Sequence, residues 1–282
     1  MPDHPRDGRS TAEMERDRVS ELRPRGDEGL KDAAERTDMP SAALVPPQPL
    51  WMRIGRRLQP AVNRVVARSS QVGDQPVHDP RQFPWVRALE DHWTEIRAEA
   101  EAVLQEIDAV PPLAEISPDH RDIAPPRKWR SFFLYGYGYR QDANVQRCPR
   151  TNALLQQVPD LNSAFFSVLA PGTHIPAHVG VTKAIMTCHL GLNVPRDSAN
   201  CWMRVVDQKL HWQPGKALVF DDTFEHEVAN DTDEVRVVLL IQFRRPTGRA
   251  GRVIGGLFLW AVKRSRFVQD ARRRVRDWNK GG

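Results

Sequence analysis

Cysteine is scarce in this sequence, and long apolar runs are absent. The three cysteines, Cys148, Cys188 and Cys201, include no CxxC pair and no spacing typical of zinc ligands. An odd, sparse count argues against a disulfide-stabilised secreted protein and indicates a reducing compartment. No run reaches the roughly 18–20 residues of a transmembrane helix, and the charged first thirty residues lack the apolar core of a secretory signal. We therefore expect a cytoplasmic protein.

Acidic residues are almost absent from the C-terminal part of the chain. From Arg244 onward, twelve lysines and arginines stand against Asp270 and Asp277, whereas the whole chain has a net charge of +5. The rest of the chain is therefore net acidic, which argues against nucleic-acid binding. A basic segment on such a body indicates a local anionic partner.

The basic segment has the periodicity of an amphipathic helix, which we expect over residues 248–282. Its apolar stripe is Ile254, Leu257, Phe258, Ala261, Val268, Ala271, Val275 and Trp278; Trp260 falls outside it. Flanking cations suit a helix lying peripherally on an anionic membrane surface. A helix packed on the protein with a solvated basic side explains the same pattern, so both interpretations stay open.

The rest of the chain is predicted to consist of a polar leader and one domain. Residues 1–80 are rich in Pro, Asp, Arg, Glu and Ser, so we predict a disordered leader containing a short basic and hydrophobic patch at residues 50–58. Residues 81–247 are predicted to form the domain, which begins with a helix over residues 83–104.

Short strands separated by Pro-Gly and Asn-Asp turns dominate the domain. After an aromatic strand at 129–139 and a short helix from 148, strands are predicted at 164–169, 184–192, 201–205, 217–220 and 235–243. Such spacing favours an all-β core with flanking helices, of the double-stranded β-helix type (jelly roll, cupin-like).

Two histidines are candidate metal ligands. His178 and His226 each lie near a predicted turn, and an arginine, Arg236, begins the next strand. This order suggests a mononuclear iron oxygenase in which two imidazoles bind Fe(II), but the usual carboxylate ligand is missing because Gly180 stands two residues after His178. Two unrelated polar residues near turns are the simpler alternative.

Arg236 is a candidate carboxylate-binding residue because it begins a strongly apolar strand. An inward-facing arginine there should be paired or ligand-bound, and its planar guanidinium suits bidentate binding of 2-oxoglutarate. An edge residue facing water is the alternative. His189 and Thr187 share one face of their strand by alternation. His189 and Ser167 can equally be hydrogen-bonded core residues, and a turn role suits Asp221 and Asp222.

These residues lie in motifs that resemble the aspartyl/asparaginyl β-hydroxylase family, which includes bacterial lipid A hydroxylases. The two motifs that carry the resemblance are Pro-x-His-x-Gly at residues 176–180 and Phe-Asp-Asp-x-x-x-His-Glu at residues 220–227. The resemblance spans residues 83–246. It implies a jelly-roll fold, Fe(II), 2-oxoglutarate as cosubstrate and O2.

The resemblance also implies roles for single residues. His178 and His226 would bind iron without a carboxylate, as in several family members with glycine at that position. Ser167 and Arg236 match the residues that hold the distal carboxylate of 2-oxoglutarate, and His189 matches one near its other carboxylate. The family commonly has arginine where this chain has Thr187, which removes one cation from the expected site.

The expected function is therefore hydroxylation of a substrate C–H bond, coupled to decarboxylation of 2-oxoglutarate. The basic C-terminal segment favours a lipid acyl chain at a membrane surface as substrate. An aspartyl or asparaginyl side chain of a protein is the second candidate. A degenerate, non-catalytic barrel that binds a small acid is the third, and Thr187 is the feature that favours it.

Overall fold

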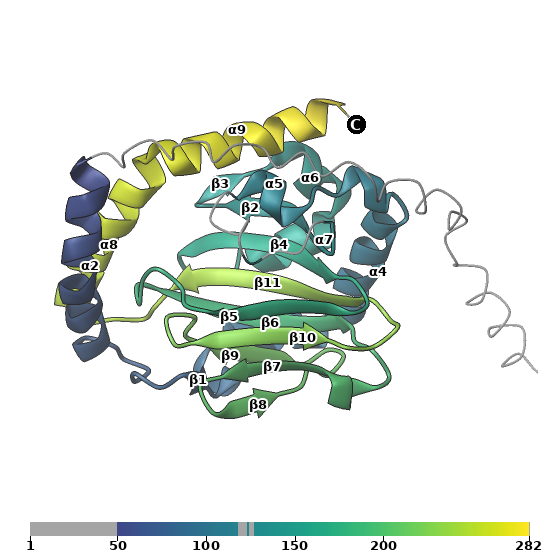
Figure 1. Ribbon diagram of the computed structural model, residues 1–282, viewed down its shortest axis with the longest axis horizontal. Coiled ribbons are helices and arrows are strands. Elements are labelled where there is room, and N and C mark those ends of the chain that lie inside the picture. Colours follow the sequence, from purple (N-terminus) through teal and green to yellow (C-terminus); the bar gives the residue numbers. More distant parts are fainter. Residues whose placement is uncertain (1–49, 118–122, 124–126, 282) are drawn as a thin grey trace, which may run out of the picture. The chain divides into compact units, whose positions relative to one another are not determined.

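The computed structural model describes residues 50–117, 123 and 127–281 (Figure 1). Most of the predicted leader, residues 1–49, lies outside the described residues. Residues 50–80, which the sequence analysis assigns to the same leader, are folded: helix α2 (Leu50–Arg68) is followed by strand β1 (Val77–His78). The reason is burial, because Val66 of α2 is fully enclosed and stabilises the helix against the domain.

Eight antiparallel strands form the barrel. They are β4 (Leu161–Leu169), β5 (Thr173–His178), β6 (Ile185–Asn193), β7 (Cys201–Val205), β8 (Gln208–Leu210), β9 (Ala217–Phe220), β10 (His226–Asn230) and β11 (Arg236–Arg244). One sheet has the order β1-β9-β6-β11-β4-β2-β3, in which β2 is Trp129–Gly136 and β3 is Tyr139–Arg140, and the other has the order β5-β10-β7-β8. The chain therefore passes back and forth between the sheets. This strand order is that of a double-stranded β-helix, which confirms the predicted fold class.

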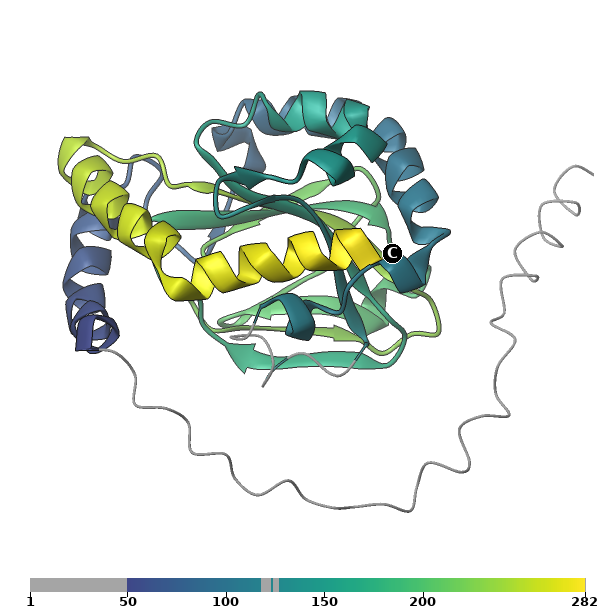
Figure 2. The same cartoon turned by 90° about the horizontal axis from the view of Figure 1, so that it is seen from above.

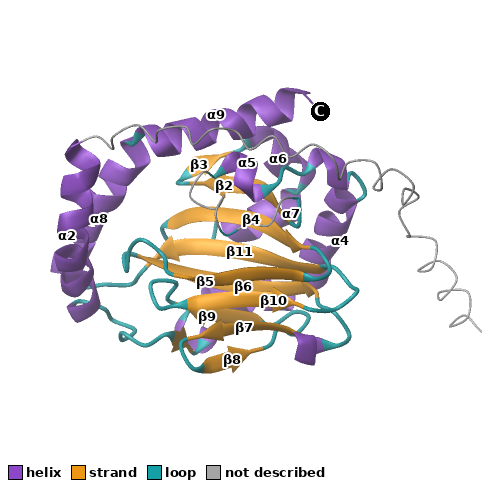
Figure 3. Ribbon diagram, viewed as in Figure 1, coloured by secondary structure: helices purple, strands orange, loops and turns teal. Residues whose placement is uncertain are grey.

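Strand alternation divides the core into an outer and an inner layer. On β4, Phe166 and Val168 face the helices, whereas Phe165 and Leu169 face the barrel interior. The outer layer lies under α3 (Trp85–Asp91), α4 (Trp93–Leu104), α6 (Asp142–Arg147) and α7 (Pro149–Leu155). Figure 3 shows α4, α6 and α7 outside the strands. The helix predicted over 83–104 is two helices, because the chain leaves helical geometry at His92.

The large sheet is extended at one edge by β2 (Trp129–Gly136) and β3 (Tyr139–Arg140). The short helix α5 (Leu113–Ile116) precedes β2, and helix α9 (Arg266–Gly281) packs on α5. No helix in the described part of the chain combines the length and apolar character needed to cross a bilayer.

The C-terminal segment forms two helices where the sequence predicts one. Helix α8 (Arg249–Arg264) packs along α2, and the chain turns at Ser265 into α9 (Figures 1 and 2). Ser265 has extended backbone angles, and its hydroxyl accepts a hydrogen bond from the Val268 amide, which caps α9. Val268, Ala271 and Val275 of the predicted stripe are buried against the protein. The packed-helix alternative therefore describes α9.

Several connections meet at one end of the barrel, here called the mouth end. The β5–β6 connection (179–184) touches the β9–β10 connection (221–225) through a hydrogen bond from the Gly180 amide to the Asp222 carbonyl, 2.6 Å long. Fully buried Asp221 pairs with Arg245, just beyond β11, and with Lys183 at 2.9 Å. Asp221 thus has the predicted turn role and ties three connections together.

Candidate metal and cosubstrate site

His178 and His226 lie beside each other at the mouth end, with their ring planes inclined by 50°. They are register partners on the adjacent strands β5 and β10, and their ring centroids are 4.1 Å apart. Residues far apart in sequence meet because strand β10 returns beside β5 in the smaller sheet.

Both imidazoles are held in one tautomer. Nδ1 of His178 lies 2.8 Å from the Pro176 carbonyl oxygen, and Nδ1 of His226 lies 3.0 Å from that of Phe224. A carbonyl only accepts, so each Nδ1 carries the proton and each Nε2 presents a lone pair. Burial lowers the pKa of His178, and burial together with neighbouring His178 lowers the pKa of His226 to about 4. Two neutral imidazoles are suitable ligands for iron.

The donor set consists of these two histidines. Within the described ranges, no group of three or more His, Cys, Asp or Glu side chains is arranged to hold a metal ion. A metal bound by His178 and His226 would thus keep open positions for oxygen ligands from water or a cosubstrate.

Gly180 leaves room for a neighbouring carboxyl group. A Cβ atom at this position would lie 2.3 Å from Oδ1 of Asp222, well inside contact distance. The side chain of Asp222 therefore fills the space that a side chain at position 180 would need.

Replacing Gly180 with aspartate is expected to lower turnover at least about tenfold, because the new side chain must displace Asp222 beside the histidines. Succinate production measures the effect. Gly136→Ala is the matched control, since a Cβ there makes an ordinary contact, 3.6 Å from Phe133. Undiminished turnover in Gly180→Asp would show that the Asp222 position has no bearing on the site.

Asp222 is a buried acid that forms no ion pair within the described ranges. Its Oδ2 accepts a hydrogen bond of 3.2 Å from the Thr187 hydroxyl. Burial, and then the charge of Asp221, raise its pKa to about 7. Thr187, where the family commonly has arginine, therefore places a neutral donor beside this carboxyl group.

This raised pKa predicts a pH-dependent stability. The folded protein binds the Asp222 proton more tightly than the unfolded chain, so the contribution is present below about pH 4 and is lost as the pH rises through about 7. Asp222→Asn stays uncharged, so in metal-free buffer its Tm should gain on that of the wild type between about pH 4 and 7 and level off above that. Exposed Asp207→Asn is the control. Parallel Tm profiles for wild type and Asp222→Asn would contradict the assignment.

Arg236 points into the barrel, so the water-facing alternative does not apply. It is 2% exposed, and its guanidinium carbon lies 4.6 Å from the Trp212 ring centroid. Among the described residues, its Nε and Nη1 have no hydrogen-bond partner. Burial lowers its pKa to about 10, so it remains a cation at neutral pH. A buried cation without an anion is costly, and the arrangement fits an anionic ligand.

The remaining predicted residues line the interior between the histidines and Arg236. His189 is buried 5.1 Å from the Phe220 ring, which is in turn 5.6 Å from that of His226. Both His189 nitrogens lack a partner within the described part of the chain, and burial keeps its pKa well below the usual value. The Ser167 hydroxyl accepts a 3.0 Å hydrogen bond from the Trp129 indole.

The structure thus brings all five predicted residues into one barrel interior. It adds two aromatic residues that the sequence analysis did not assign, Trp212 and Phe220. Trp212 is 1% exposed and stacks near both His189 and Arg236. It lies in the connection between β8 and β9, where no periodicity marks which side chains turn inward.

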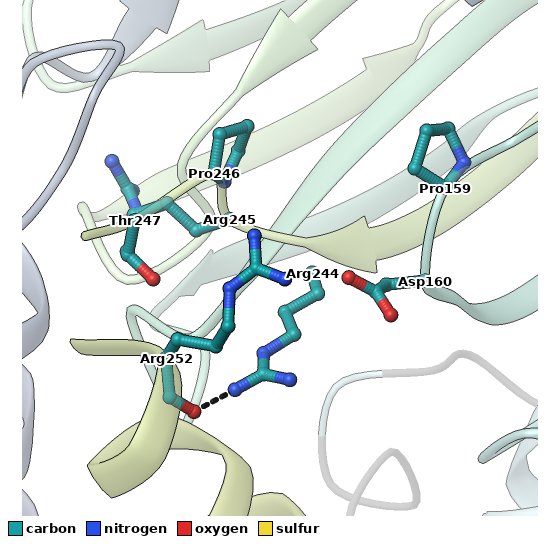
Figure 4. A pocket seen from close by; sticks show the side chains of 7 residues that line it. All are labelled: Pro159, Asp160, Arg244, Arg245, Pro246, Thr247 and Arg252. Atoms are coloured by element: carbon teal, nitrogen blue, oxygen red, sulfur yellow. Dashed lines mark hydrogen bonds between the residues drawn. The ribbon is translucent and has the colours of Figure 1, made fainter. Parts of the chain in front are cut away.

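A surface pocket of about 100 Å³ lies outside this interior. Figure 4 shows it beside the end of β11, lined by Pro159, Asp160, Arg244, Arg245, Pro246, Thr247 and Arg252. Arg244 donates a hydrogen bond to the Arg252 carbonyl there. None of the five predicted residues lines this pocket, and Arg236 is at the opposite end of β11, so it is not the candidate site.

Comparison with known proteins agrees with this geometry. The family model for aspartyl/asparaginyl β-hydroxylase matches residues 90–246. An ornithine lipid ester-linked acyl 2-hydroxylase of Rhizobium tropici is 37% identical over 211 residues, covering 75% of each chain. The human aspartyl/asparaginyl β-hydroxylase is 29% identical over 180 residues, which are 61% of this chain and 23% of that protein.

Solved structures give weak overall matches. The cupin domain of an XRE family transcriptional regulator from Enterobacter cloacae covers 41% of this chain and 96% of its own, with 11% identity and a TM-score of 0.29. The Schizosaccharomyces pombe Cnp3 cupin domain covers 46% and 72%, with 9% identity and a TM-score of 0.30. The assignment of the fold rests on the strand order described above.

Proposed function

Because the chain belongs to the aspartyl/asparaginyl β-hydroxylase family, we propose that it is an Fe(II)- and 2-oxoglutarate-dependent hydroxylase acting on a lipid acyl chain. One observation carries the proposal: Arg236, two of whose nitrogens have no hydrogen-bond partner among the described residues, is buried in the interior of a barrel whose mouth holds two neutral histidines. A cation at this depth fits a dicarboxylate that reaches from the arginine to a metal.

The histidines would hold the metal through Nε2, because each Nδ1 is bonded to a backbone carbonyl. Those bonds fix the ring orientation and the tautomer before any metal arrives. When bound, Fe(II) and 2-oxoglutarate supply the oxidation: O2 places one oxygen atom in succinate and the other in the substrate C–H bond, with release of CO2.

The interior residues would hold the cosubstrate. Arg236 offers the distal carboxylate two nitrogens that have no partner in the described part of the chain, and the Ser167 hydroxyl lies on the neighbouring strand. Neutral His189 lies closer to the metal end and can donate to the other carboxylate. The rings of Trp212 and Phe220 flank His189 and exclude water from this region.

The lipid substrate is favoured over two alternatives. The similarity to the Rhizobium tropici lipid hydroxylase covers three quarters of both chains, whereas the similarity to the human protein hydroxylase covers less of this chain at lower identity. Hydroxylation of an aspartyl or asparaginyl side chain is the second candidate. A non-catalytic barrel that binds a small acid is the third, and the intact histidine pair and Arg236 oppose it.

Anaerobic titration with Fe(II) and then 2-oxoglutarate tests the proposal. We expect a weak visible charge-transfer band at one equivalent of each, followed by succinate formation when O2 and ornithine lipid are added. No band would refute the metal and cosubstrate assignment. A band without succinate on any substrate would favour the non-catalytic barrel, and hydroxylation only of Asp- or Asn-containing peptides would favour the protein substrate.

A further inference from the structure

Exposed hydrophobic side chains gather at the mouth end. Eight large ones are exposed among the described residues, and six of these belong to α2, α8 or the β5–β6 connection. These six are Leu58, Val179, Val181, Val253, Leu257 and Trp260. A seventh, Val206, lies in the neighbouring β7–β8 turn, and only Val235 lies at the opposite end of the barrel. Scattered exposed hydrophobics need no explanation, but a gathering beside a site does.

The helices are joined directly to the connection that follows His178. Gln59 of α2 donates a 2.6 Å hydrogen bond to the Val181 carbonyl, and Asn63 accepts one of 3.0 Å from the Lys183 amide. On α8, Gly255 packs against Ala184 and Val66. Figures 1 and 2 both show α2 and α8 side by side. Leu58, Val179 and Val181 thus form part of one surface with the helix pair.

The outer face of α8, on the opposite side of the helix from Gly255, holds the other three of these side chains. Val253, Leu257 and Trp260 follow at steps of four and three, which puts them on one helix face, and they are 60%, 64% and 56% exposed. Arg249 begins this face and Arg264 ends it, with its guanidinium 4.1 Å from the Trp260 ring centroid. Trp260, which the predicted stripe leaves out, is therefore part of the exposed face.

The charge of the helix pair has one sign. Neither α2 nor α8 contains aspartate or glutamate. Exposed cations on the pair are Arg57, Arg64, Arg68, Arg249, Arg252 and Arg264. Two copies meeting through this face would bring like charges together, whereas anionic lipid headgroups would neutralise them and accept the apolar side chains below.

We propose that this surface, formed by α2, the outer face of α8 and residues 179–181, docks on an anionic lipid bilayer. Docking would place the barrel mouth, with His178 one residue from exposed Val179, against the membrane that contains the acyl chains. The delivery of acyl chains rests on the proposed function, whereas the docking itself does not.

Sedimentation with vesicles tests the docking. At low salt, the full chain should bind vesicles that contain phosphatidylglycerol, and it should bind vesicles of pure phosphatidylcholine much more weakly. Arg249→Gln with Arg264→Gln should weaken binding about 25-fold, at about fivefold per cation. The triple variant Val253→Gln, Leu257→Gln, Trp260→Gln should weaken it about tenfold or more.

Matched controls separate this surface from general charge and apolarity. Arg273→Gln with Arg276→Gln on α9 removes two exposed cations elsewhere, and Val235→Gln removes an exposed apolar side chain at the far end. Both controls should bind vesicles as the wild type does, and circular dichroism should show that all variants are folded.

Other results would overturn the inference. If the α9 control loses binding and the α8 variants keep it, the membrane-binding element is α9. If the wild type ignores anionic vesicles, or if the triple variant turns a dimer into a monomer with unchanged vesicle binding, the surface does not dock on lipid. Hydroxylation of detergent-dispersed lipid without vesicle binding would refute docking and leave the proposed function intact. Vesicle binding without any hydroxylation would support docking and refute the proposed function.

Discussion

Replacing either His178 or His226 with alanine is expected to abolish stoichiometric Fe(II) binding and to reduce turnover by more than about 100-fold. The described residues offer no third side chain arranged to complete a metal-binding group with them. Even the loss of a group that only orients a ligand costs about 10- to 100-fold in metal affinity or activity, so loss of one of two ligands should exceed this. Anaerobic Fe(II) titration and succinate production measure the two effects.

His174→Ala is the matched control for both variants. His174 lies on the same strand, four residues before His178, but it points to solvent and contacts Glu227. This variant should bind iron and turn over as the wild type does. Full succinate production by His178→Ala or His226→Ala would show that the metal lies elsewhere.

Replacing Arg236 with alanine is expected to raise the KM for 2-oxoglutarate about ten- to a hundredfold, and replacing it with lysine should raise it less. A hydrogen bond to a charged group contributes about 1.5–3 kcal/mol. Lysine keeps the charge and loses the bidentate geometry. Steady-state kinetics over a range of 2-oxoglutarate concentrations measures the effect.

A thermal measurement distinguishes lost binding from a damaged fold. Without ligand, Arg236 is a buried cation, and two of its nitrogens lack a partner among the residues that the structure describes, so its removal should not lower the Tm of the ligand-free protein. Added 2-oxoglutarate should raise the Tm of the wild type and should leave that of Arg236→Ala unchanged. Equal KM values for wild type, Arg236→Ala and Arg236→Lys would mean that another residue holds the carboxylate.

The sequence predicts the larger sheet better than the smaller one. Strands β4, β6, β9 and β11 are mostly apolar because both of their faces are buried, and the predicted ranges agree with the observed ones within a few residues. The sequence does not predict β5 and β10 as strands. Thr173–His178 contains a proline and two histidines, and because buried and exposed positions alternate along it, it has no apolar run. The candidate metal ligands lie on these two strands, so motif spacing located them where hydrophobic pattern did not.

Strand alternation predicts that Arg236 shares a face with Val238 and Leu240, but both faces of β11 are buried, so the sequence leaves open which face lines the barrel interior. The residues around Gly180 could not be predicted from the sequence. The glycine suggests an empty space beside the histidines, but the carboxyl group of Asp222, from another connection, fills the space that a side chain at position 180 would need. Likewise, helical periodicity marks the apolar residues of the C-terminal segment but not which of them face the protein, since α8 and α9 turn different faces inward after the break at Ser265.

Strand β11 is one continuous element between the residue proposed to bind the cosubstrate and the helix proposed to dock on lipid. It begins at Arg236, and helix α8 follows shortly after its last residue. Nine strand residues span about 30 Å, and the strand is paired on both sides, so its length cannot vary. If the cosubstrate and the bilayer bind as proposed, the cosubstrate would be held at a fixed depth below the lipid-facing surface, and β11 would set the distance between that surface and the metal. Hydroxylation would then fall on one carbon at a set distance from the headgroup rather than on a spread of positions.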